Sequence, residues 1–197
     1  MDELGLDFSK TDAKELIGRA ALMQLLASVN SEIAIHASAW AARDMELDSV
    51  RGIAYSPVHL EEIATEHMYL GHIPTLIDAP VEMYPNFSVL AYRVSEVENG
   101  GWDQKGHLHR VELAVEVMVK SLESEEVVNK RIQRTSDCVN QVILNDPTLR
   151  GLVSSTEFVS VDVSDVFIRR EEKSRGPRWF WQGARLEYTI DKPAAYA

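Results

Sequence analysis

The sequence is poor in several features that mark common classes of protein. Cys138 is the only cysteine, so an intramolecular disulfide is impossible, which fits a reducing compartment. No apolar run approaches the roughly 18 residues that a membrane span requires, so no membrane partner is expected. The opening residues, MDELGLDFSKTD, are acidic and lack the basic region of a signal peptide, so we expect no export by that route.

Positive charge is also scarce. The chain has 20 Lys and Arg residues against 31 Asp and Glu residues, a formal net charge of −11. General nucleic-acid binding requires basic side chains that displace counterions from phosphates, so this balance argues against it. An acidic surface would let DNA pass without binding, and it would equally serve solubility alone. Both interpretations remain open.

Motifs that would carry catalysis are missing. The sequence contains no serine nucleophile elbow and no Asp-rich cation loop. The stretch Asn99-Gly100-Gly101-Trp102 lacks the strand-to-helix context of a phosphate-binding loop. Cys138 falls within a predicted helix, where a buried structural thiol is favoured over a nucleophile. We therefore expect neither an enzyme nor a cofactor.

Two groups of histidines were weighed as metal ligands. His59, Glu62 and Glu66 share one face of a predicted helix, with His67 beside them, but no HExxH motif is present. His107 and His109 fall on the same face of a predicted strand, where ordinary surface positions are favoured. No metal site is predicted. A metal- or small-molecule-binding domain remains the alternative class.

The N-terminal part of the chain has a helical composition. Residues 11–47 contain no proline and a single glycine, and they predict one long helix or two abutting ones. Ser56-Pro57 has the pattern of a helix start, which predicts a second helix that ends at Gly71. The connector that follows, residues 72–85, holds three prolines and marks the best domain boundary.

The remainder predicts strands around one helix. Alternating apolar residues at 111–119 indicate a half-buried strand, and β-branched and aromatic residues at 87–97 indicate another. At 125–145 the apolar period changes to three and four residues, which predicts a helix with Ser124 as N-cap. Two further strands are predicted at 158–170, with a bulge near Ser164-Asp165, and at 179–190.

This order predicts an α+β fold. We expect a mostly antiparallel four-stranded sheet, in the order β-β-α-β-β, with the helix packed on one face and an N-terminal helical region before it. The predicted domains are residues 1–75 for the helical region and 76–197 for the α+β part.

The candidate functional residues are interface residues rather than catalytic ones. One dense basic cluster surrounds the turn between the third and fourth predicted strands, where it is either a solvated hairpin tip or a docking element for an acidic neighbour. Nearby tryptophans favour docking. A polar face of the 125–145 helix is a further candidate subunit contact. The residues are Trp102, Lys105, Arg169, Arg170, Lys173, Arg175, Arg178, Trp179 and Trp181, with Lys130 and Arg134 on the helix.

Residues 85–191 resemble a known family in the order of their elements. The strand at 108–119, the helix at 125–145 and the segment Asn145-Asp146-Pro147-Thr148-Leu149-Arg150-Gly151 are similar to the core of tail terminator and related head–tail joining proteins of long-tailed bacteriophages. The block from Asp165 through Tyr188 resembles the last hairpin of that family.

The resemblance implies a structural virion protein made in the host cytoplasm. It would form a homo-oligomeric ring, typically a hexamer, at the tail–neck junction, with the tail tube protein and a neck or connector protein as partners. DNA would pass through the lumen without specific binding, and the loops at 98–107 and 170–178 would be docking arms. Another neck or tail-completion ring protein fits the same residues.

Overall fold

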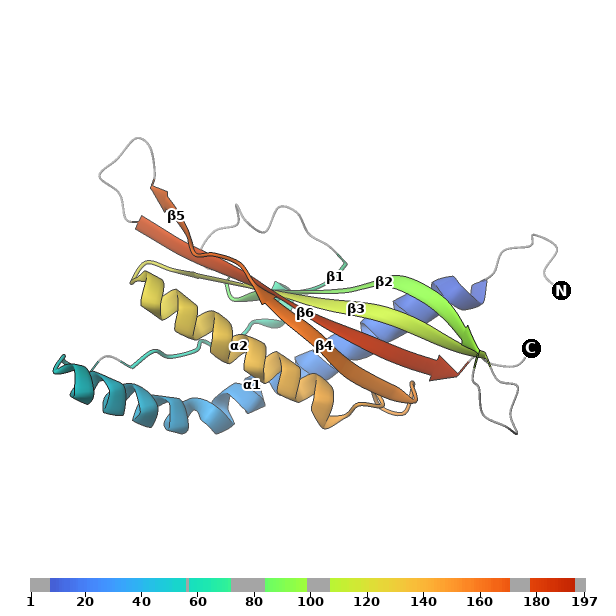
Figure 1. Cartoon of the computed structure of the whole chain (residues 1–197), viewed down its shortest axis with the longest axis horizontal. Helices are drawn as coiled ribbons and strands as arrows, with labels where there is room; N and C mark the ends of the chain where they lie inside the picture. Colours follow the sequence, from blue (N-terminus) through green and yellow to red (C-terminus); the bar gives the residue numbers. More distant parts are fainter. Residues whose placement is uncertain (1–7, 56, 72–83, 99–106, 171–177, 194–197) are drawn as a thin grey trace.

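The computed structural model describes residues 8–55, 57–71, 84–98, 107–170 and 178–193. Its elements, in chain order, are α1 (Phe8–Arg51), the 3-10 helix η1 (Thr65–His67), β1 (Met68–Leu70), β2 (Asn86–Glu98), β3 (His107–Ser121), α2 (Glu125–Asn145), β4 (Ser155–Val163), β5 (Phe167–Arg170) and β6 (Arg178–Pro193). The strands form one layer, and both α-helices lie against the same face of it (Figure 1). The α+β class predicted from the sequence is confirmed.

The sheet is larger than predicted and not entirely antiparallel. Six strands are described, in the order β1-β2-β3-β6-β4, with β5 also paired to β6. β1 runs parallel to β2, whereas the other pairings are antiparallel. The prediction of four strands missed β1, which has only three residues, and it joined β4 and β5 into one strand. The segment 164–166 separates them, and the register irregularity lies at Val159.

The strand and helix predicted at 111–119 and 125–145 are confirmed as β3 and α2. All five alternating apolar residues of β3, from Val111 to Val119, are at most 3% exposed. Ser124 caps α2 by accepting a hydrogen bond from the N–H of Val127 at 3.2 Å. Glu125 and Glu126 occupy the first turn, where the helix dipole favours negative charge. The two hydrophobic periods therefore define the centre of the core.

The N-terminal helix is a single element of 44 residues, about 66 Å long at 1.5 Å per residue. Its first half covers β1 and β2, where a Cβ on Gly18 would meet Leu70 at 3.0 Å and keep the two elements apart. From Gln24 to Arg51 it runs antiparallel to α2. Gln24 donates to the carbonyl of Val142 near the end of α2, and Arg51 pairs with Glu126 at its start. α1 shares one hydrophobic core with the sheet and α2.

The second helix predicted after Ser56-Pro57 is wrong. The described residues 57–64 are extended, and only the short η1 follows before β1. Long-range hydrogen bonds hold the backbone in this form. The amide of Asn30 on α1 bonds both the carbonyl and the N–H of Ile63, at 3.0 and 2.9 Å, and the N–H of Val58 donates to Asp44. These contacts replace the local bonds that a helix would make.

Candidate interaction site

One group of exposed apolar side chains on the described surface lies on neighbouring strands of the sheet. Six large hydrophobic side chains on β4 and β5 are between 39% and 57% exposed. We call them the apolar edge: Phe158, Val159, Val161, Val163, Phe167 and Ile168. Isolated exposed hydrophobics are ordinary, but a group of six on two neighbouring strands is typical of an interaction surface.

The apolar edge is exposed because the helices stop short of it. Val161 is paired with Leu186 and Val163 with Ala184, and those two residues of β6 are at most 5% exposed. Paired residues share a face of the sheet. Val161 and Val163 therefore continue the core face one strand beyond the part that α1 and α2 cover. In Figure 1, β5 and the start of β6 extend away from both helices.

β4 has little of the protection that natural edge strands carry. Among the described strands it pairs with β6 alone, so its other side presents backbone N–H and C=O groups without a ladder partner. Residues 155–163 contain no lysine, arginine or proline, the residues that usually block strand addition. Val159 is an irregularity in the ladder, and the acidic residues Glu157 and Asp162 are its charged members. The strand is open to pairing with a complementary chain.

A shallow hollow of about 350 Å³ lies beside this edge, on the sheet face away from the helices. We call it the open-face hollow. One end is aromatic, because the rings of Phe167 and Trp181 stack at 4.2 Å with an angle of 10°. The other end is charged, with Glu116, Asp162 and Arg185. Gly183 lies between the two ends, and its missing side chain leaves the floor low.

The charges in the hollow are unbalanced. Arg185 is held by two carboxylates, since its Nη1 lies 2.9 Å from Glu116 Oε1 and its Nε lies 3.0 Å from Glu187 Oε1. Its guanidinium also lies over the ring of Tyr92, 5.1 Å from the centroid. Asp162 is opposite Arg185 in the strand register but forms no ion pair with any residue that the structure describes. The carboxylate of Asp162 is thus available to a cation from outside the described part of the chain.

Two of the three predicted tryptophans, Trp179 and Trp181, are half-buried on strands. Trp181 forms the aromatic end of the hollow, and Trp179 lies under the ammonium group of Lys120 at 4.9 Å. Arg169, Arg170 and Arg178 belong to the paired strands β5 and β6, but their side chains fall outside the described part. The remaining candidates, Trp102, Lys105, Lys173 and Arg175, lie outside the described residues, as do most of both proposed docking arms.

The two candidates on α2 serve a contact inside the chain. Arg134 is 8% exposed, its Nη2 lies 2.7 Å from Asp44 Oδ1, and its guanidinium lies over the ring of Trp40. The ammonium group of Lys130 is 3.1 Å from the same carboxylate oxygen. Both basic groups join α2 to the second half of α1. Lys130 and Arg134, whose spacing suggested a contact between subunits, therefore pair with α1 of the same chain.

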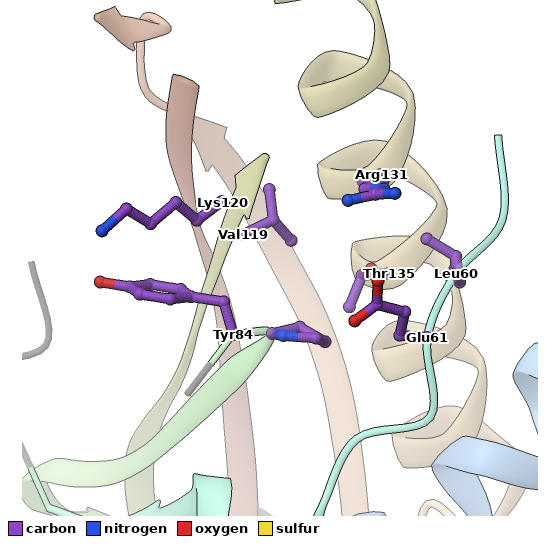
Figure 2. Close-up of a pocket in the computed structure, with 8 residues that line it drawn as sticks. Leu60, Glu61, Tyr84, Val119, Lys120, Arg131 and Thr135 are labelled. Carbon is purple, nitrogen blue, oxygen red and sulfur yellow. The ribbon is translucent and has the colours of Figure 1, made fainter. Parts of the chain in front are cut away.

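A small cavity lies near the same end of β3, at Val119 and Lys120, between that strand, α2 and the extended segment before η1 (Figure 2). Arg131 and Thr135 line it from α2, while Tyr84 and Lys120 extend side by side away from them. Its volume of about 20 Å³ is enough for one water molecule and not for a metabolite. The guanidinium Nε of Arg131 is buried there and has no hydrogen-bond partner among the residues that the structure describes. The cavity offers a hydration site.

The histidines do not assemble a site in the described part. His59 and Glu62 lie on the extended segment and His67 in η1, so the shared helix face predicted for them is wrong. No group of three or more potential metal ligands occurs among the residues that the structure describes. His109 is 8% exposed, and the side chain of His107 is outside the description. Within the same ranges, no helix combines the length and apolarity of a membrane-spanning segment.

Cys138 should be unreactive in the folded protein. It is 1% exposed, and burial, together with the nearby carboxylates of Glu32 and Asp137, raises the pKa of its thiol to about 12. Because the thiolate is the reacting species, we expect a disulfide reagent to label the native protein very slowly and the urea-unfolded protein fast. Rapid stoichiometric labelling of the folded protein, followed by absorbance at mildly alkaline pH, would contradict this burial.

Fold and surface together define a two-layer α+β protein with an open apolar sheet edge. No protein-family model matches the chain, and no curated protein matches it. Among solved structures, one chain of a "Virion of native gene transfer agent (GTA) particle" is 13% identical, with a TM-score of 0.32. The alignment covers 66% of this chain and 80% of that one. A TM-score of this size does not establish a shared fold.

Proposed function

We propose that this chain is a non-enzymatic structural subunit that associates with copies of itself through the apolar edge. The observation that carries the proposal is the exposure of six large hydrophobic side chains on β4 and β5, next to an unpaired strand edge. Burying an exposed valine or phenylalanine side chain contributes about 1.5–3 kcal/mol. Pairing of β4 would add backbone hydrogen bonds and fix the register of the contact.

The proposed setting is a virion, at the junction of tail and neck. Its support is the sequence resemblance to tail terminator and head–tail joining proteins, together with the order β2-β3-α2-β4-β5-β6 on which that resemblance rests. The particular role is a ring, typically a hexamer, that caps the tail tube and joins it to a neck or connector protein. A net charge of −11 suits a lumen through which DNA passes without binding. Another neck or tail-completion ring is the second candidate, and position in an assembled particle separates the two.

The association should depend on Val161 and Val163. We expect the purified wild-type protein to form an oligomer of defined size, measured by size-exclusion chromatography with light scattering. The double substitution Val161→Lys and Val163→Lys places two charges on the apolar edge and should shift the protein to monomer. Both residues are exposed, so folding should be preserved.

The matched control is Val50→Lys, because Val50 is an 81% exposed valine on α1 and does not belong to the apolar edge. Circular dichroism verifies that each variant is folded. A wild-type protein that stays monomeric at high concentration would overturn self-association. If Val50→Lys dissociates the oligomer as much as the double substitution does, the apolar edge is not the specific contact.

A further inference from the structure

The open-face hollow has the chemistry to hold a basic side chain. Its aromatic end, the stacked Phe167 and Trp181, offers a ring surface of the kind that attracts cations. Its charged end carries Asp162, whose carboxylate has no ion-pair partner among the described residues. The rings lie at Trp181 and the carboxylate lies opposite Arg185, four residues or about 13 Å apart along β6. One basic side chain can therefore pair with Asp162 while a second lies over the rings, and the missing side chain at Gly183 leaves room for them.

The chain itself supplies a suitable cation. Residues 169–178, RREEKSRGPR, hold five of the 20 Lys and Arg residues in an otherwise acidic protein. This basic segment leaves β5 and returns in β6, with Arg169 paired to Trp179 and Arg170 to Arg178. Opposite charge on two distinct patches favours head-to-tail contact between copies, with each patch meeting its complement.

The contact is not available within one protomer for the described strand positions. Arg178 and Arg185 are seven residues apart on β6, which corresponds to about 23 Å along a strand. Arg170 is paired with Arg178 and lies at the same distance from the charged end of the hollow, and Arg169 is paired with Trp179, which is six residues or about 20 Å from Arg185. An arginine side chain is much shorter than this separation. A second copy can place its basic segment there instead.

We propose that the open-face hollow of one copy receives basic side chains of residues 169–178 of the next copy, with Asp162 as the acceptor and Arg169 as the first donor. This inference rests on the proposed self-association and specifies its geometry. The hollow and the basic segment are different patches, so the contact is heterologous. Repetition of a heterologous contact gives a closed ring when the rotation closes, and a filament when it does not.

A reciprocal charge exchange tests the pairing in the full-length protein. Asp162→Arg alone and Arg169→Asp alone should each weaken self-association by about tenfold or more, because like charges then face each other. An equimolar mixture of the two variants should recover association. Arg169 of the Asp162→Arg variant can then pair with the native Asp162 of the Arg169→Asp variant, and the two substituted side chains also carry opposite charges. The double variant Asp162→Arg/Arg169→Asp should associate by itself. Sedimentation velocity measures all four samples.

Two control variants keep the outcome specific. Glu62→Arg reverses an exposed acid on the segment before η1, and Arg93→Asp reverses a 68% exposed base on β2, so neither should weaken association comparably. A monomeric wild-type protein would overturn the proposed function itself. A wild-type oligomer that is insensitive to Asp162→Arg would overturn this pairing alone. Loss without recovery in the double variant would overturn the assignment of Arg169 as the partner.

Discussion

Replacement of Asp44 by alanine should lower the free energy of unfolding by about 3–5 kcal/mol, the usual cost of removing one partner from a buried ion pair. Asp44 is 2% exposed and binds Arg134 at 2.7 Å, Lys130 at 3.1 Å and the N–H of Val58 at 3.2 Å. Without the carboxylate, the buried guanidinium of Arg134 is left uncompensated. Since small domains are stable by about 5–15 kcal/mol, this is a large fraction of the total.

Urea unfolding followed by circular dichroism measures this loss. The matched control is Arg93→Ala, which removes an ion pair with Glu112 in which the arginine is 68% exposed. Exposed pairs contribute about 0–1 kcal/mol, so the control should change stability little. Equal effects of the two substitutions would contradict the role given to Asp44 in joining α1, α2 and the extended segment.

Acid should weaken the same contact. Burial alone would raise the pKa of Asp44, but the hydrogen bonds from Arg134, Val58 and Lys130 outweigh it and leave the pKa below the ordinary 3.8. A depressed pKa stabilises the folded state above the unfolded-state pKa, and this contribution disappears as the pH falls through the folded-state value. We expect the loss below about pH 4. Asp44→Asn should lack this part of the acid dependence.

Leu149→Ala should cost about 2–5 kcal/mol of unfolding free energy, the range for truncation of a fully buried leucine. Leu149 is 0% exposed, although it belongs to the turn after α2. Its φ of 46° is in the left-handed region, which bulky residues seldom adopt. Burial of the side chain offsets that backbone cost, so alanine would retain much of the strain and lose the contact.

Asp146 organises the turn around this leucine. Its carboxylate accepts hydrogen bonds from the N–H of Thr148 at 3.2 Å and of Arg150 at 2.8 Å, and its carbonyl accepts one from the N–H of Leu149. Leu122→Ala is the matched control, because Leu122 is 48% exposed. Its urea midpoint should stay close to that of the wild type. A small effect of Leu149→Ala would mean that the turn repacks and does not anchor the end of α2.

The parts of the fold that follow from local periodicity were predictable. The alternation of apolar residues at 111–119 predicts β3, and their spacing of three and four at 125–145 predicts α2. The absence of proline predicts α1. The segment after Ser56 was mispredicted because its conformation depends on Asn30, Asp44 and Arg134, which are distant in sequence. Local capping patterns carry no information about such partners. β1 escaped prediction because a three-residue strand has no measurable period.

In the candidate site too, local sequence predicts the strands but not the contacts between distant segments. Valines in phase at 159, 161 and 163 indicated a strand, but whether another layer covers a strand depends on where the helices end, which the strand sequence does not contain. Arg134 has the spacing of a surface residue on α2 and is buried because α1 lies over it. The stacking of Phe167 on Trp181 required the pairing of β5 with β6. These features arise from tertiary packing alone.

The central place of β6 has a consequence for synthesis of the protein. β6 follows every other strand in the chain, yet it separates β3 from β4 and β5 in the sheet. A nascent chain can therefore complete α1, β2, β3 and α2 while β4 still lacks its only described neighbour. Domains fold as units once their segments have emerged from the ribosome. The proposed contact surface on β4 would consequently form last, so an incomplete chain would not yet present it.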